Sequence, residues 1–141
     1  MAPRQTTGTP TIFMVEDEED TASLLILLLG AYGYEIEHAT EGRQAQHMID
    51  TIAPPNLVLL DIMLPHLSGL ELLPYIRQKS GWRNVPAIML TADSDEHNVK
   101  QALEDGAHDY LVKPFHSHTL TARINRFLKP PPSRGSDEGP E

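Results

Sequence analysis

The sequence contains no cysteine, few aromatic residues (6%) and only 11 lysines and arginines among its 141 residues. Without cysteine, neither a disulfide framework nor a thiolate metal site is available. The 20 acids give a formal net charge of -9, which disfavours contact with nucleic-acid phosphates. The densest apolar stretch, residues 24–29, is far shorter than a membrane span, and no basic region followed by an apolar stretch begins the chain. We therefore expect a soluble cytoplasmic protein without a membrane or nucleic-acid partner.

The two ends of the chain differ in composition from its middle. Residues 1–10 are polar and include two prolines, which predicts a flexible leader. Residues 129–141 are rich in proline, glycine and charged side chains and cannot support a core, which predicts a disordered acidic tail. We expect a single domain over residues 11–128, which is long enough to bury a core.

Strand-like and helix-like segments alternate through this domain. Apolar runs predict strands at residues 11–15, 34–38, 57–60, 86–90 and 109–112, and a helix-like stretch follows each of them. Such alternation is typical of βαβ units with a parallel sheet. Right-handed crossovers favour the strand order 2-1-3-4-5 with helices on both faces. The predicted fold is therefore α/β, with a five-stranded parallel sheet flanked by five helices in a flavodoxin-like doubly wound arrangement.

The helices carry more specific expectations. The first, at about residues 19–31, has a wide apolar face that we expect to be mostly core, with its excess leucines available for docking. Pro74 predicts a kink or a late start in the third helix. The expected caps are Thr40 for the second helix and Ser94 or Asp95 for the fourth, whose inner face would hold Val99, Ala102 and Leu103.

Four of the apolar runs end on polar residues. Glu16 and Asp17 follow the first strand, Asp61 the third, Thr91 the fourth and Lys113 the fifth. Because the carboxyl ends of parallel strands meet at one edge, we expect these side chains to converge. The predicted order places the first and third strands side by side, so the three carboxylates would repel one another unless a cation intervenes. Mg²⁺ suits such a site, since it takes oxygen ligands and shares phosphoryl oxygens.

The segments IFMVEDEED, LVLLDIMLPHLSGLELL, AIMLTAD and GAHDYLVKPF resemble the receiver domain of bacterial two-component response regulators, of the chemotaxis-regulator kind. Each motif alone is a weak signal. The four together, in this order and spacing, cover residues 11–128 and are highly specific.

The resemblance implies that Asp61 is a nucleophile. It would take a phosphoryl group from a sensor histidine kinase or a histidine phosphotransfer protein and form an aspartyl phosphate. Asp17, Asp61 and the backbone carbonyl of Met63 would ligate Mg²⁺ or Mn²⁺, and Glu16 would reach the ion through water. Phosphoryl transfer of this kind asks the protein mainly for positioning and charge stabilisation. The domain would not be an enzyme beyond self-phosphorylation from small donors and autodephosphorylation.

The remaining implied roles concern the phosphoryl group and the switch. Lys113 would neutralise phosphoryl oxygens, while the Thr91 hydroxyl and the backbone of Ala92, next to that of Met63, would surround the group. Thr91 and Tyr110 would move on phosphorylation and change the face made by the fourth helix, fifth strand and fifth helix. The Lys113–Pro114 peptide bond would be cis.

Other conspicuous residues receive plainer interpretations. Trp82 is expected to pack against the domain, and all seven histidines are interpreted as surface or packing residues. Met63 and Asp93 lie where relatives tune attack of water on the aspartyl phosphate. The lifetime of the phosphorylated state stays open, because Met63 is apolar and Asp93 could orient water.

Three hypotheses about output stay open. The favoured one is a stand-alone receiver that signals by protein contact, as a monomer or a weak phosphorylation-dependent dimer, because the Gly-Pro-Glu ending reads as a natural terminus. The second is the N-terminal regulatory domain of a DNA-binding transcription factor. Asp109 and Arg123 suit its charged dimer face, whereas Val99 and Thr119 do not. The third is a Mg²⁺-dependent phosphatase of the haloacid dehalogenase type, but the first strand lacks the DxD pattern of that class.

Overall fold

The computed structural model describes residues 9–92 and 96–128. Its sheet contains five parallel strands in the order β2-β1-β3-β4-β5, as predicted. The strands are β1 (Thr11–Val15), β2 (Glu35–Ala39), β3 (Leu57–Asp61), β4 (Ala87–Thr91) and β5 (Asp109–Val112). Strands that follow one another in the chain are joined by a crossover through a helix, which the alternation in sequence requires.

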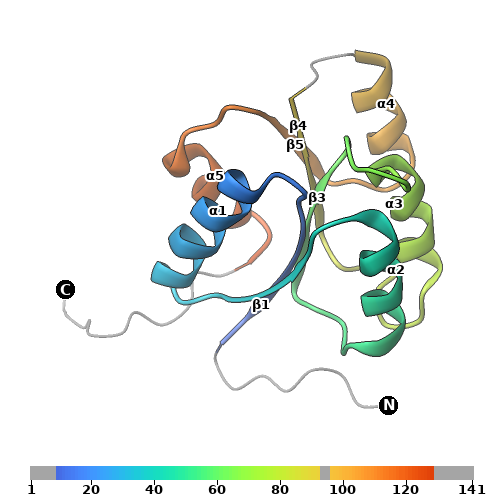
Figure 1. The fold of residues 1–141 in the computed structure, drawn as a ribbon, viewed down its shortest axis with the longest axis horizontal. Helices are drawn as coiled ribbons and strands as arrows, with labels where there is room; N and C mark the ends of the chain where they lie inside the picture. The colour runs from blue at the N-terminus through green and yellow to red at the C-terminus, as the bar shows by residue number, and fades with distance from the viewer. Residues whose placement is uncertain (1–8, 93–95, 129–141) are drawn as a thin grey trace.

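Helices cover both faces of the sheet. Those in the described residues are α1 (Glu19–Ala31), α2 (Gly42–Thr51), α3 (Gly69–Gln78), α4 (Glu96–Glu104) and α5 (Ser117–Ile124). In Figure 1, α1 and α5 lie on one side of the sheet, and α2, α3 and α4 lie on the other. The fold is therefore the doubly wound arrangement that was expected.

The central strands are buried on both faces. All residues of β1, β3 and β4 are buried, so these strands do not alternate between apolar and polar residues. Their side chains divide between two cores, with Phe13 on the side of α2 and α3 and Ile12 on the side of α1 and α5. Trp82 is 1% exposed and packs edge-on against Phe13, with ring centroids 5.5 Å apart. Its predicted packing role is confirmed.

The predicted cap of the second helix is wrong by one residue. The helix begins at Gly42, and its N-cap is Glu41, whose side chain accepts a hydrogen bond from the Arg43 amide. Thr40 instead donates from its amide and hydroxyl to Gln44 Oε1, at 2.7 and 2.9 Å. A carboxylate at the N-terminus also interacts favourably with the helix dipole, so Glu41 is the better cap.

The third helix starts early and runs through its proline. Ser68 and Glu71 form a reciprocal capping box that sets the first turn at Gly69. Pro74 lies inside the helix, where its missing N–H costs one intrahelical hydrogen bond. The predicted alternative of a late start is wrong, because the cap and four buried residues (Gly69, Leu72, Leu73 and Ile76) hold the helix.

Two helices leave some of their apolar residues exposed. On α1 the buried residues are Ala22, Leu25 and Leu29, whereas Leu24 is 59% and Leu27 is 72% exposed. Leu28 is half-buried against the same core, so two of the five leucines of α1 lie outside it, as the expected excess. On α4 Ala102 is buried and Val99 is half-buried, whereas Leu103 is 44% exposed, so the predicted inner face is wrong for Leu103. Both helices rest on the sheet by one narrow stripe.

Arg77 of α3 bonds to several backbone carbonyls at the amino ends of β4 and β5. Its guanidinium donates to the carbonyls of Trp82, Arg83, Val85 and Gly106, at 3.3, 3.1, 2.8 and 2.8 Å. Burial lowers the pKa of Arg77. These bonds join α3, the segment before β4 and the turn that follows α4.

His108 sits next to this arginine. Its Nδ1 accepts a hydrogen bond of 3.2 Å from the Ala87 amide, and its ring packs edge-on against Phe127. Burial, and secondarily the charge of Arg77, lower the pKa of His108. The ring is thus held as neutral imidazole just before β5, next to the first residue of β4.

Several expectations fall outside the described residues. These are residues 1–8 of the predicted leader, the tail over residues 129–141, the caps Ser94 and Asp95, and the flanking residue Asp93. None of the described helices has the length and apolar character needed to cross a bilayer.

Candidate functional site

The predicted site residues converge at the carboxyl edge of the sheet. β1 and β3 are paired with Val15 opposite Leu60, so the residues that follow, Glu16 and Asp61, are neighbours. One carboxylate oxygen from each of Glu16, Asp17 and Asp61 lies within 4.8 Å of the others. Strand pairing thus brings together acids that are far apart in the sequence.

Lys113 reaches into this cluster from the end of β5. Its Nζ lies 2.7 Å from Glu16 Oε1 and 2.9 Å from Asp61 Oδ2. The side chains of Glu16 and Asp61 are 0% and 4% exposed, and that of Lys113 is 14% exposed. The Lys113–Pro114 peptide bond is cis. The ammonium group therefore sits between two buried carboxylates and neutralises part of their charge.

Burial and hydrogen bonding shift the pKa values of Glu16 and Lys113. Burial raises the pKa of Glu16, the hydrogen bond from Lys113 opposes this shift, and the charge of Asp61 adds to it. Burial alone would lower the pKa of Lys113, but its hydrogen bonds to Glu16 and Asp61 outweigh burial and raise that pKa. The cluster thus holds excess negative charge that a single lysine only partly balances.

Asp61 is oriented at both of its oxygens. Oδ1 accepts a 3.0 Å hydrogen bond from the Met63 amide, and Oδ2 faces Lys113. The Met63 side chain is 59% exposed. Gly69 packs against the backbone of Asp61, since a Cβ at Gly69 would lie 2.1 Å from the Asp61 carbonyl oxygen. A short turn therefore presents the carboxylate in one fixed direction.

The hydroxyl and amide expected beside Asp61 are at the end of β4. Thr91 is fully buried, and its carbonyl accepts a 2.7 Å hydrogen bond from the Lys113 amide. Ala92 follows it and is exposed. The ends of β4 and β5 are thus tied together directly beside the lysine.

The acidic cluster fits a hard divalent cation. Its ligand atoms are carboxylate oxygens, and Asp17 is exposed while the other two acids are buried. Mg²⁺ prefers oxygen donors and retains several waters, which an open side of this kind allows. The chemistry of the donor set therefore agrees with the cation that the sequence predicted.

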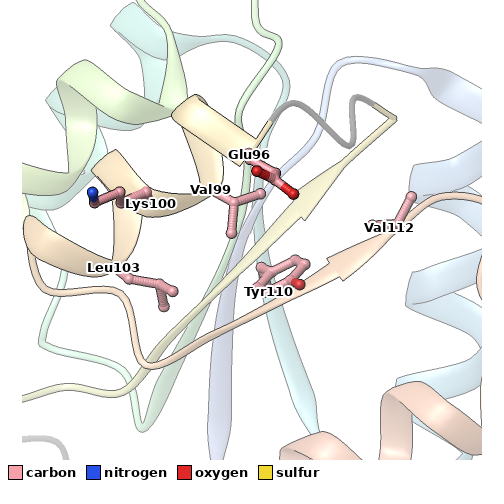
Figure 2. Close-up of a pocket in the computed structure, with 6 residues that line it drawn as sticks. All are labelled: Glu96, Val99, Lys100, Leu103, Tyr110 and Val112. Carbon is pink, nitrogen blue, oxygen red and sulfur yellow. The ribbon is translucent and has the colours of Figure 1, made fainter.

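Tyr110 lies away from these acids, on the face between α4 and β5. It is 37% exposed and lines a cavity of about 290 Å³ together with Glu96, Val99, Lys100, Leu103 and Val112. Figure 2 shows Val99 of α4 directed toward the Tyr110 ring of β5. The floor of this cavity is mostly apolar.

Sequence reasoning did not single out His38. The structure places its Nε2 2.9 Å from the backbone oxygen of Glu16. His38 also lines a cavity of about 430 Å³ beside Asp17. Only the pairing of β2 with β1 brings His38 to this place, and a lone histidine on an edge strand carries no signal of it.

Together these features define a doubly wound α/β domain with an acidic edge that fits a divalent cation and a half-buried lysine beside it. The family model described as response regulator receiver domain matches residues 12–125. The chain therefore belongs to the response regulator receiver family. Proteins of this family take a phosphoryl group from histidine kinases and serve in signalling rather than as classical enzymes, and Mg²⁺ binding is typical of them.

Similar proteins of known sequence are transcriptional regulators. The phosphate regulon transcriptional regulatory protein PhoB of Rhizobium meliloti is 40% identical over 120 residues, which are 85% of this chain and 52% of PhoB. The DNA-binding response regulator MtrA of Mycolicibacterium paratuberculosis is 37% identical over 92% of this chain and 54% of MtrA. The chain thus spans about half the length of these relatives. Their names give no support to the expectation that nucleic acid is not a partner.

Solved structures show the same fold. Chemotaxis protein CheY4 of Vibrio cholerae matches with a TM-score of 0.80 and 28% identity, over 85% of this chain and 99% of CheY4. The receiver domain of a sensor histidine kinase from Pseudomonas aeruginosa matches with a TM-score of 0.77 and 29% identity, over 84% of this chain and 97% of that domain. The latter structure has a magnesium ion coordinated in its active-site cleft.

Proposed function

We propose that Asp61 is the phosphoacceptor of this receiver domain, and that the donor is the phosphohistidine of a sensor histidine kinase or a histidine phosphotransfer protein. The observation that carries the proposal is the environment of its carboxylate. One oxygen is held by the Met63 amide and the other by Lys113 at 2.9 Å, at the end of the buried central strand β3. The carboxylate is therefore held in a fixed orientation before a donor arrives.

The transfer needs little covalent chemistry from the protein. A carboxylate oxygen of Asp61 attacks phosphorus, the bond from phosphorus to the donor's imidazole nitrogen breaks, and the imidazole leaves with that electron pair. Lys113, released from one carboxylate, then neutralises a phosphoryl oxygen. The hydroxyl of Thr91 and the amide of Ala92 bind another. No general base is required, because the nucleophile is already an anion.

The metal is proposed to be held by Asp17, Asp61 and the Met63 carbonyl, with Glu16 bound through water. When bound, Mg²⁺ or Mn²⁺ would neutralise charge on the acids and the transferred group. Support for this set comes from the 4.8 Å grouping of the three carboxylates. Glu16, which pairs closely with Lys113, serves mainly to hold the ammonium in place.

The test is phosphorylation by a small donor. The protein is incubated with acetyl phosphate or phosphoramidate and Mg²⁺, and its intact mass is measured. Wild type should gain one phosphoryl adduct, Asp61→Asn should gain none, and Asp17→Ala should need far more Mg²⁺. Asp105→Asn, a change of the same kind just after α4, should behave as wild type. An equal adduct on Asp61→Asn would contradict the assignment.

The output is proposed to use the face of α4, β5 and α5. Tyr110 is 37% exposed in this structure, and the apolar cavity between α4 and β5 lies next to it. Movement of Thr91 toward the phosphoryl group would leave room for Tyr110 to turn inward. Such a change would remodel the cavity and thereby the surface that a protein target contacts.

A second candidate output is regulation of transcription as part of a longer protein. The specific observation is that PhoB and MtrA match this chain over about half of their lengths. Asp109, one of the residues suited to a charged dimer face, already pairs within the chain with Arg123 at 2.9 Å. Sedimentation of the phosphorylated protein separates the two outputs, since a tight dimer favours the transcriptional one and a monomer favours a stand-alone receiver. The cytoplasmic location stays a prediction.

A further inference from the structure

His38 occupies an unusual position at the edge of the sheet. β2 ends at Ala39, and β1 ends one residue before Glu16, so the Glu16 carbonyl points beyond the regular strand pairing. The Glu16 amide still donates to the Ala39 carbonyl at 3.1 Å. The imidazole of His38 then contacts the Glu16 carbonyl at 2.9 Å and extends the link between β1 and β2 by one more hydrogen bond.

The direction of this hydrogen bond is fixed by chemistry. A backbone carbonyl oxygen only accepts, so Nε2 of His38 carries the hydrogen and donates it. A ring nitrogen that carries a hydrogen has no lone pair for a metal, so Nε2 cannot be a metal ligand. Through Nε2, His38 bonds to the backbone and does not serve as a fourth ligand of the acidic cluster.

With this bond, every polar atom of Glu16 is held. Its amide bonds to Ala39, its carbonyl to His38, Oε1 to Lys113 at 2.7 Å, and Oε2 to the Glu18 amide at 3.1 Å. The first two contacts fix the main chain and the last two fix the side chain. Glu16 thus serves as a rigid anchor at the end of β1.

The anchor matters because of the residue that follows it. The Glu16 carbonyl and the Asp17 amide belong to one planar peptide group, so holding the carbonyl sets the direction in which Asp17 leaves the strand. Asp17 is exposed, and its side chain depends on its backbone for its place beside Glu16 and Asp61. A rotation of this peptide group would carry the Asp17 carboxylate away from the cluster.

We propose that His38 is a positioning residue for the metal site, which holds the Glu16–Asp17 peptide so that the Asp17 carboxylate stays in ligand range. The inference rests on the proposed Mg²⁺ site. Partners that orient metal ligands typically contribute tenfold to a hundredfold in metal affinity. A contact made through the backbone belongs at the lower end, so we expect about a tenfold effect.

The experiment compares two substitutions of equal length. His38→Gln keeps an N–H donor near the place of Nε2, whereas His38→Met fills similar space without a donor. The Mg²⁺ dissociation constant is measured by calorimetry, without any phosphodonor. His38→Met should weaken Mg²⁺ binding about tenfold, and His38→Gln should stay within about threefold of wild type. His47→Met, on the exposed face of α2, is the matched control and should bind as wild type.

Thermal unfolding in EDTA separates positioning from stability. The metal-free variants should unfold within about 4 °C of wild type, which corresponds to less than about 1 kcal/mol. His38→Asn, which keeps an amide but places it short of the carbonyl, should show the same weakened binding as His38→Met. The inference is overturned if His38→Met or His38→Asn binds Mg²⁺ as tightly as wild type, or if His38→Gln binds as weakly as His38→Met. Failure of the proposed function would appear instead as wild type that gains no phosphoryl adduct.

Discussion

Lys113 Nζ lies 2.9 Å from Asp61 Oδ2, although 52 residues separate the two in sequence. The same ammonium lies 2.7 Å from Glu16 Oε1. In the metal-free protein the lysine therefore serves as the cation of the site. A divalent ion and the lysine compete for the same negative charge, so the stability of the domain and its Mg²⁺ binding are linked.

Substitution of Lys113 by methionine should make the domain depend on Mg²⁺ for stability. The change leaves Glu16 and Asp61 as buried carboxylates without their shared cation, which should cost about 2–4 kcal/mol of unfolding free energy in EDTA at neutral pH. Mg²⁺ should restore much of this loss and should stabilise the variant more than wild type. Urea unfolding with and without Mg²⁺ measures both effects.

The matched control for this prediction is Lys79→Met. Lys79 pairs with Asp50 at 3.5 Å, with side chains 36% and 46% exposed. Solvent screens such surface pairs, so the control should lose little stability and gain no additional response to Mg²⁺. Equal stabilisation of wild type and Lys113→Met by Mg²⁺ would contradict the linkage.

Two glycine-to-alanine substitutions should have opposite effects. At Gly69 a Cβ would lie 2.1 Å from the Asp61 carbonyl oxygen, and backbone must shift to admit it. We expect a loss of about 3 kcal/mol and slower phosphorylation, because the displaced residue is Asp61 itself. At Gly30, in α1, a Cβ meets nothing within 4 Å, so Gly30→Ala should stabilise the helix by about 0.5 kcal/mol. Denaturant unfolding of both variants is the measurement, and a neutral Gly69→Ala would show that the turn after β3 is loosely packed.

His108 should make the domain less stable in mild acid. Protonation would place an N–H on Nδ1 against the Ala87 amide and a positive charge beside Arg77. Burial and Arg77 hold the pKa of His108 below its ordinary value of 6.5, so folding favours the neutral ring. The stability that this ring contributes is fully present above pH 6.5 and is lost as pH falls through that value toward the lower pKa of the folded state.

The test is the pH dependence of the unfolding temperature between neutral and mildly acidic buffer. His108→Asn keeps an acceptor in the place of Nδ1 but does not titrate, so its unfolding temperature should fall less than that of wild type. His118→Asn, on the exposed start of α5, should follow wild type. An identical pH dependence of wild type and His108→Asn would show that other groups cause the acid sensitivity.

Much of the fold and the gathering of the acids could be predicted because both follow from local patterns. Uninterrupted apolar runs identify strands buried on both faces, and the carboxyl ends of parallel strands must lie at one edge. The positions of Asp61, Asp17 and Lys113 after strands predict their convergence in this way. A residue directly after a strand needs only the strand order to be placed.

The failures concern residues whose surroundings depend on packing between elements. Leu103 has helical spacing toward the sheet, but it is 44% exposed, and Ala102 is the fully buried residue of α4. Thr40 is a good cap by type, yet the adjacent Glu41 takes that role. His38 and Arg77 act on backbone groups of other elements, and the sequence carries no mark of such acceptors. Their roles emerge only once the strands are paired.

The burial of β3 also has a consequence for the timing of motions. β3 lies between β1 and β4 with all of its residues buried, whereas β5 is an edge strand whose Tyr110 and Val112 are each 37% exposed. Amide hydrogens of β3 should therefore exchange with solvent only when the whole domain opens, and those of β5 should exchange through local opening. The proposed phosphoacceptor, Asp61, thus belongs to the slowest part of the molecule, while the surface proposed to report its phosphorylation belongs to a faster one.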